Sequence, residues 1–175
     1  SMPKITSISN TTKGVKIVVD NDMGMCYIYR KTTGGKWENV GFTNGVTYID
    51  KTAQSGTTYT YTVRCVSYLN SSVSLSAYDT KGKTITYLET PELSSATSTK
   101  SGVKLQWDKV VEATGYKVYR KTGNSGWGEA IATVKGNSVV TYVDKTAKKG
   151  VTYTYTVRAY NGSTKSGYIA AGKTV

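Results

Sequence analysis

The feature that most constrains this chain is an internal repeat that runs through nearly all of its 175 residues. The segment TYTYTVR at residues 58–64 returns identically at 152–158, and TYIDKTA at 47–53 returns as TYVDKTA at 141–147. Shorter matches on either side keep the same order, and each copy opens near one of the two prolines. Such order indicates duplication of a structural unit. We therefore expect two tandem domains, residues 1–89 and 90–175.

The pattern within each copy is typical of β-strands. Tyr153, Tyr155, Val157 and Ala159 alternate with more polar residues, which is the period of a strand with one apolar face. No window shows a helical apolar period, and Gly, Ser, Thr and Asn punctuate the chain about every ten residues. Counting the runs gives about seven strands per copy. The chain is predicted to be all-β, with two tandem immunoglobulin-like sandwiches.

At this level of detail both copies resemble fibronectin type III domains of the kind found in secreted and cell-surface proteins of Gram-positive bacteria. The resemblance rests on Trp107 and on three segments, GYKVYR at 115–120, YVD at 142–144 and GVTYTYTVRA at 150–159. It covers essentially the whole chain. It implies a seven-stranded sandwich and says little about ligands.

The first copy departs from this pattern in its core. Val19 stands where the second copy has a tryptophan, and Cys26 and Cys65 stand where it has a tyrosine and an alanine. The family topology implies that the two cysteines face each other on neighbouring strands. They would form either a disulfide or a buried pair of thiols. Because its core is smaller, we expect the first domain to be the less stable one.

Four polar residues that recur at equivalent places receive structural roles. The resemblance implies that Tyr59 and Tyr153 fill the corner of each sandwich while their hydroxyls bond to the backbone of the preceding connection. Asp50 and Asp144 each follow a short strand and are expected to cap a turn through their own backbone. A catalytic carboxylate pair would lie together in one cleft, whereas these residues occur once per domain.

Composition argues against an enzyme. The chain has no histidine, and its two cysteines cannot form a four-cysteine zinc site. Residues 167–174 fit the phosphate-loop expression GxxxxGK[ST], but they lie where the family has its last strand, and the motif requires a following helix. We expect no catalytic residue, no cofactor and no metal.

The formal net charge of +12 is divided unequally between the copies. Residues 1–90 contain 10 basic and 6 acidic residues, giving +4, whereas residues 91–175 contain 13 and 5, giving +8. A solvated surface is the favoured explanation of this excess, and binding to cell-wall polysaccharide or another polyanion is the next. The chain has no run of five or six basic residues and no arginine-rich stripe, so the pattern is not typical of a nucleic-acid site.

Trp37 and Trp127 follow glycine-rich turns and are the candidates for stacking on sugar rings, with packing at the sheet edge as the favoured alternative. We expect a non-catalytic spacer or scaffold pair that positions neighbouring domains of a larger secreted or cell-surface bacterial protein. It would be an elongated monomer with a short connection at residues 86–91. The second hypothesis is a carbohydrate-binding, cell-wall-binding or adhesion module that uses exposed aromatic residues, Tyr29, Tyr119 and Tyr160 included. The apolar runs are too short for membrane insertion.

Overall fold

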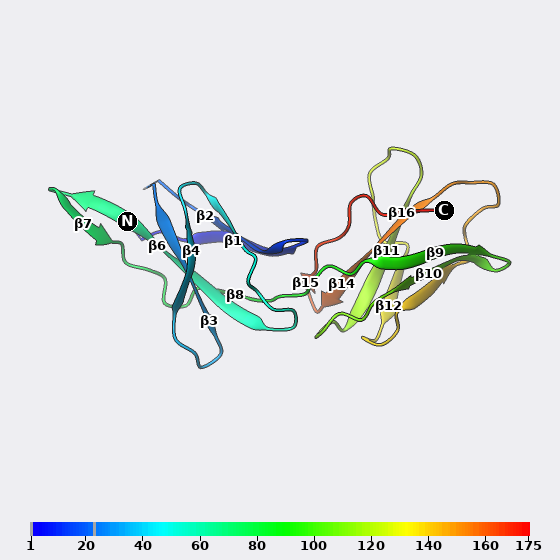
Figure 1. The fold of residues 1–175 in the computed structure, drawn as a ribbon, viewed down its shortest axis with the longest axis horizontal. Coiled ribbons are helices and arrows are strands. Elements are labelled where there is room, and N and C mark those ends of the chain that lie inside the picture. Colours follow the sequence, from blue (N-terminus) through cyan, green and yellow to red (C-terminus); the bar gives the residue numbers. More distant parts are fainter. Residues whose placement is uncertain (1, 23) are drawn as a thin grey trace. The chain divides into compact units, whose positions relative to one another are not determined.

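The computed structural model describes residues 2–22 and 24–175. The chain divides into two compact units, unit 1 (residues 1–87) and unit 2 (residues 88–175). The sequence places the boundary two residues later, after residue 89. Every regular element of the described residues is a β-strand, so the all-β fold class is confirmed (Figure 1).

Unit 1 is a sandwich of two antiparallel sheets. One sheet has the order β1–β2–β5, and the other has the order β4–β3–β6–β7, with β8 also paired to β6. The long strand β6 forms a hairpin with β7 that projects at one end of the unit (Figure 1). The strands are β1 (Ile5–Thr11), β2 (Gly14–Val19), β3 (Cys26–Thr32), β4 (Glu38–Thr43), β5 (Thr47–Asp50), β6 (Thr58–Leu69), β7 (Ser72–Leu75) and β8 (Lys83–Thr86).

Unit 2 repeats this topology. Its sheets have the orders β9–β10–β13 and β12–β11–β14–β15, with β16 also paired to β14. The counterpart of the projecting hairpin is shorter, because β15 contains only two residues. The strands are β9 (Leu93–Thr99), β10 (Gly102–Trp107), β11 (Gly115–Lys121), β12 (Ala132–Lys135), β13 (Thr141–Asp144), β14 (Thr154–Asn161), β15 (Thr164–Lys165) and β16 (Lys173–Thr174).

The last strand of each sandwich is interrupted, so the described part of each unit has eight strands where the sequence suggests about seven. Residues 76–82 leave the sheet between β7 and β8. Outward side chains of β6 replace the missing ladder, since the hydroxyl of Thr62 donates to the Asp79 carbonyl at 2.7 Å and Arg64 Nε donates to the Ser76 carbonyl at 2.9 Å. In unit 2, Thr156 and Arg158 make the same two contacts with Ile169 and Ser166.

The two cores are filled in different ways. In unit 2 the fully buried Trp107 and Tyr116 pack edge to face, with ring centroids 5.4 Å apart. In unit 1 Val19 takes the tryptophan position, and Cys26 lies directly opposite Cys65 on β3 and β6. Both cysteines are fully buried, their Cα atoms are 3.9 Å apart and their sulfurs form a disulfide. A covalent bond therefore stands in unit 1 where unit 2 has aromatic packing.

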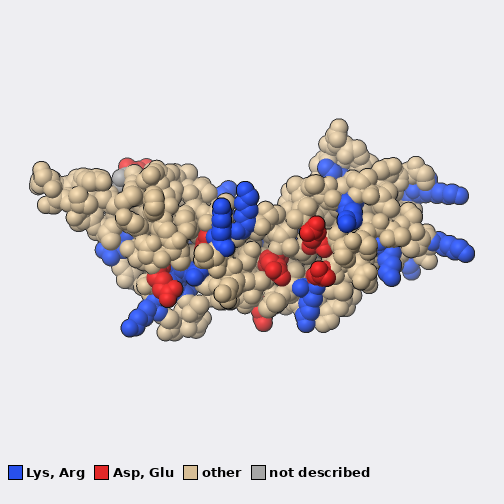
Figure 2. Space-filling view, viewed as in Figure 1, with Lys and Arg blue, Asp and Glu red and all other residues tan. Residues whose placement is uncertain are grey.

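The surface carries Lys and Arg side chains on both units, with fewer acidic ones (Figure 2). The chain has many threonines and lysines and 15 tyrosines, and all three residue types contribute to its low mean hydropathy of −0.37. Many of these tyrosines lie in the two cores or against them.

We predict that the double variant C26A/C65A lowers the free energy of unfolding of unit 1 by about 4 kcal/mol, because the bond closes a loop with a sequence separation of 39. Urea unfolding of the whole chain measures this, with the transition of unit 2 as the internal reference. An unchanged unit 1 midpoint would contradict the prediction, as would alkylation of both thiols, seen by intact mass, without prior reduction.

Candidate functional site

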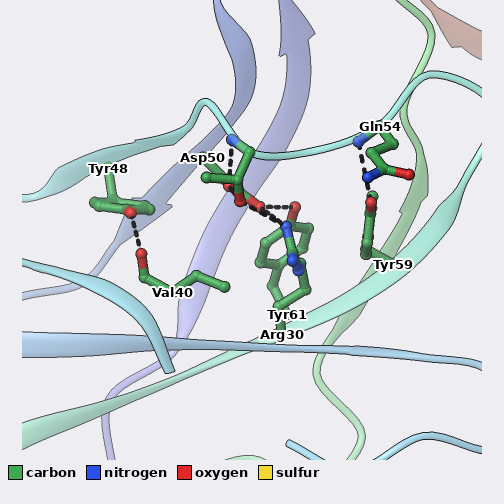
Figure 3. A network of polar contacts seen from close by, with 8 residues as sticks. Arg30, Val40, Tyr48, Asp50, Gln54, Tyr59 and Tyr61 are labelled. Atoms are coloured by element: carbon green, nitrogen blue, oxygen red, sulfur yellow. Dashed lines mark hydrogen bonds and ion pairs between the residues drawn. The ribbon is translucent and has the colours of Figure 1, made fainter. Parts of the chain in front are cut away.

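A buried polar cluster joins the two sheets of unit 1 (Figure 3). Asp50 ends β5 on one sheet, while Arg30 and Tyr61 lie on β3 and β6 of the other. The carboxylate of Asp50 is completely buried. It accepts hydrogen bonds from Arg30 Nη1 at 2.8 Å and from the Tyr61 hydroxyl at 2.7 Å. These bonds cross the sandwich and connect its layers.

The other carboxylate oxygen of Asp50 organises the turn that follows β5. The backbone N–H of Thr52 donates to it at 3.0 Å, and the hydroxyl of Thr52 donates at 2.7 Å. Arg30 also donates to the Thr52 hydroxyl oxygen at 2.9 Å. The expected turn cap is confirmed, and it forms half of a larger network. Because the carboxylate is hydrogen-bonded at both oxygens, its burial is compensated.

The corner tyrosine completes the cluster. The backbone N–H of Gln54 donates to the Tyr59 hydroxyl at 3.0 Å, which confirms the role implied by the resemblance (Figure 3). The guanidinium of Arg30 lies 4.5 Å from the centroid of the Tyr59 ring. Arg30 is therefore held between a carboxylate and an aromatic face, and both contacts favour a cation at this place.

Unit 2 contains the same cluster with nearly the same distances. Arg120 Nη1 lies 2.9 Å from Asp144, the Tyr155 hydroxyl donates to Asp144 at 2.7 Å, and Thr146 donates at 3.0 and 2.7 Å. The hydroxyl of Tyr153 accepts from the backbone of Lys148 at 3.1 Å. Each sandwich therefore holds one carboxylate, and the two carboxylates belong to different units.

The pKa values of the aspartates and tyrosines in these clusters favour a structural role over proton transfer. Burial raises the pKa of Asp50 and of Asp144. Hydrogen bonds from the neighbouring tyrosine, threonine and arginine lower it, and together they outweigh the effect of burial. Both pKa values therefore lie below the ordinary 3.8. Burial and the bond to the carboxylate raise the pKa of Tyr61 and Tyr155. A general acid or base works best with a pKa near the working pH. These groups have been moved away from it.

The two candidate tryptophans are half-buried and each lies beside a lysine. Lys31 Nζ is 4.6 Å from the centroid of Trp37, whose ring also packs edge to face with that of Tyr78, the two centroids being 6.3 Å apart. Lys121 Nζ lies 4.9 Å from the centroid of Trp127. Both rings therefore have packing partners, and their use in ligand stacking stays a prediction.

Unit 2 has a small hollow next to its tryptophan. The hollow has a volume of about 120 Å³. Aromatic side chains from three segments line it, together with a basic and a hydroxyl group. Its lining consists of Tyr119, Trp127, Gly128, Thr156, Arg158 and Tyr168. Of these residues, Tyr119 and Trp127 are sequence candidates. Tyr168, whose ring lies 5.3 Å from the guanidinium of Arg158, is not.

No family model matches the chain, and no curated protein does. Solved structures are similar to it. A two-domain fibronectin type III segment from chicken tenascin shares 16% identity at a TM-score of 0.46, covering 100% of this chain and 99% of that one. The FN1–FN3 domains of chicken CNTN1 share 14% identity at a TM-score of 0.41, covering 100% and 67%.

The chain folds as two tandem fibronectin type III sandwiches. The strand orders of the chain itself carry this assignment, because each unit pairs its first, second and fifth strands in one sheet and its third, fourth and later strands in the other. Within the part of the chain that the structure describes, no group of three or more Cys, Asp or Glu side chains is placed to hold a metal ion. Among those same residues, no helix is long and apolar enough to cross a bilayer.

Sequence reasoning missed the arginine of each buried cluster. Arg30 follows Cys26 and Ile28 in the inward phase of β3, and Arg120 repeats this phase in β11. An arginine at an inward position requires a buried anion, and in each copy an aspartate ends a strand of the other sheet. This pairing of an inward cation with a recurring carboxylate is the signal that identifies the cluster.

We predict that Y155F lowers the free energy of unfolding of unit 2 by about 2 kcal/mol at pH 7, because it removes a hydrogen bond to a buried carboxylate. The pKa of Asp144 is lower in the folded protein than the ordinary 3.8. The ionised carboxylate therefore stabilises the fold above pH 3.8, and this stabilisation is lost as the pH falls through the pKa of the folded protein. The difference between variant and parent should therefore shrink at pH 2.5. Urea unfolding at the two pH values measures it.

The matched control is Y119F, which removes a hydroxyl from the neighbouring strand outside the cluster. It should change the stability at both pH values by less than about 0.5 kcal/mol. A Y155F effect that is equally large at pH 7 and pH 2.5 would contradict the electrostatic explanation.

Proposed function

We propose that the chain is a non-catalytic spacer pair that positions neighbouring domains of a larger secreted or cell-surface protein of a Gram-positive bacterium. The observation that carries this proposal is the junction between the units. Tyr87 pairs with the backbone of unit 1, since its carbonyl accepts from Gly56 at 2.7 Å and its N–H donates to Thr57 at 2.9 Å. The next residue, Leu88, is fully buried in the core of unit 2.

No unconstrained residue separates these two anchored residues. A flexible linker gains its reach from several unconstrained residues. Here Tyr87 is hydrogen-bonded to unit 1, and Leu88, the next residue, is packed in the core of unit 2. Pro91 is also buried, and the residue before a proline is restricted to extended conformations. A spacer has to hold its neighbours at a set distance, and a connection that is anchored on both sides supports that role.

The extracellular setting is supported by the disulfide and by the surface. Disulfides persist in oxidising compartments and are rare in the cytosol of mesophiles. The Cys26–Cys65 bond takes the place of core packing in unit 1, so this unit benefits directly from such a compartment. The high net charge and the threonine-rich strand faces favour a solvated monomer over association.

We predict that the distance between a label on each unit has a narrow distribution, and that insertion of GSGS between Tyr87 and Leu88 broadens it at least about twofold, as expected when a short flexible linker is added. Spin labels at T33C and S163C, both exposed positions outside strands, allow the distance distribution to be measured by pulsed electron paramagnetic resonance. A GSGS insertion after Ser125, in the connection between β11 and β12 that carries neither label, is the control and should leave the distribution narrow. A broad distribution in the parent chain would remove the spacer proposal.

A second candidate function, carbohydrate binding, is favoured by the aromatic hollow of unit 2. Sugar rings present apolar faces, and partly exposed aromatic rings can cover them. Trp127, Tyr119 and Tyr168 provide three rings around one hollow, and Arg158 adds a hydrogen-bond donor. The hollow is small, so it fits the end or one unit of a glycan rather than a long segment.

We predict that W127A weakens binding of a wall glycan roughly tenfold, the effect of losing one stacking contact of about 1.4 kcal/mol. Calorimetric titration of purified peptidoglycan and wall-polysaccharide fragments measures this. W37A is the matched control, because Trp37 occupies the same place in unit 1 and packs edge to face with Tyr78. Equal losses in both variants, or no binding by the parent chain to any fragment, would exclude the hollow as a glycan site.

A further inference from the structure

Four lysines converge at one end of unit 2. Lys100 lies in the turn between β9 and β10, and Lys145, Lys148 and Lys149 lie in the connection that follows β13. Their side chains are exposed and border a single hollow of about 800 Å³. Three of these lysines lie within residues 145–149, and the fold brings the turn that carries Lys100 beside them. This gathering is the feature that sequence reasoning did not find.

No acidic side chain balances the charge of this cluster within the hollow. Hydroxyl, backbone and aliphatic groups, the ring of Tyr153 and the last residue, Val175, supply the rest of the lining. The neighbouring carboxylate, Asp144, is buried and is paired with Arg120. In Figure 2 the right-hand end of unit 2 shows basic side chains and no acidic ones on the visible face. Four cations thus face solvent together, where a ligand with several negative charges gains from all of them.

The backbone beneath the lysines is ordered by local hydrogen bonds. The hydroxyl of Thr99 donates to the Gly102 carbonyl at 2.8 Å and accepts from the N–H of Ser101 at 3.2 Å, which fixes the turn that carries Lys100. The backbone N–H of Lys148 donates to the hydroxyl of the corner tyrosine, Tyr153. The charges are therefore carried on flexible stems from fixed points, an arrangement that suits repeated anionic groups on a flexible chain.

Unit 1 lacks this cluster although it has the same two turns. Thr12, Gln54 and Ser55 take the places of Lys100, Lys148 and Lys149, and only the Lys145 position is again a lysine, Lys51. Lys13 adds one further charge in the first turn. The lysine cluster is thus a property of unit 2 and not of the fold. It follows that the fold does not require these lysines.

We propose that the lysine cluster, defined as Lys100, Lys145, Lys148 and Lys149, binds a linear anionic polysaccharide through its repeating phosphate or sulfate groups. The ligand class follows from what the hollow offers. Lysines act as point charges for such groups. The aromatic ring that borders the hollow, Tyr153, is buried and cannot stack on nucleic-acid bases. The site goes beyond a spacer role, since it would hold unit 2 against an anionic surface.

The test exchanges residues between the two units of the intact chain. The variant K100T/K148Q/K149S gives unit 2 the residues of unit 1, and T12K/Q54K/S55K makes the reverse exchange. Binding of poly(glycerol phosphate) and of dextran sulfate at low salt is measured by interferometry, with neutral dextran as the uncharged probe. The first variant should bind roughly a hundredfold more weakly, because each lysine near a dense anionic surface contributes about fivefold. The reverse variant should bind more tightly than the parent.

The control variant is K109Q/K135Q/K165Q, which removes the same charge from exposed positions elsewhere on unit 2. An equally large loss in this control would show that only net charge matters and would overturn the proposal. Equal affinity for oligothymidylate would overturn the assignment to a polysaccharide. Binding of the phosphate probe alone, or of the sulfate probe alone, would support the site and identify the anionic group.

Val175 also borders the hollow, so the measurement is repeated with Thr-Tyr appended, the residues that follow the corresponding position in unit 1. The parent affinity should be retained, because the lysines lie on the two turns. Loss of binding in the extended chain would overturn the proposal. Circular dichroism of every variant confirms that the sandwiches remain folded, as expected for exposed positions.

Discussion

Each sandwich depends on a charged bond that crosses its core. An aspartate at the end of the fifth strand is completely buried, and an arginine and a tyrosine from the opposite sheet bond to it. Packing of apolar faces alone would allow two sheets to slide, since the hydrophobic effect has no direction. A buried carboxylate has fixed positions for its partners, and leaving it unpaired is costly. The cluster therefore determines how the sheets align, and it orders the turn beyond the strand at the same time.

The comparison of the two units shows which parts of this fold are fixed and which are adjustable. The cross-sheet cluster and the corner tyrosine are the same in both, down to distances that agree within about 0.1 Å. The far end of the core differs. Unit 2 fills it with Trp107 and Tyr116, whereas unit 1 has Val19 and a disulfide. A smaller apolar volume and a covalent bond thus replace a larger volume, which ties the stability of unit 1 to its redox environment.

Much of the fold follows from the sequence, because the repeat and the period of two are strong signals. The corner tyrosines and the turn-capping aspartates could be assigned from their place in the pattern. The cross-sheet role of Arg30 could not be assigned that way, because an arginine at the end of a strand is usually solvated. Only its inward phase, repeated at Arg120, indicates otherwise. The interrupted last strand was also missed, since it depends on contacts from Thr62 and Arg64 to a segment more than ten residues away.

Duplication also offers an argument about function. Residues that both units need for folding are retained in both, so a feature present in one unit only is free of that requirement. The disulfide and the lysine cluster are both of this second kind. The first has an evident structural explanation, since it substitutes for core volume. The lysine cluster has none, because four like charges in one place destabilise a folded surface by mutual repulsion. This repulsion is present in unit 2 and absent from unit 1, and it is best explained by a ligand that the lysines bind.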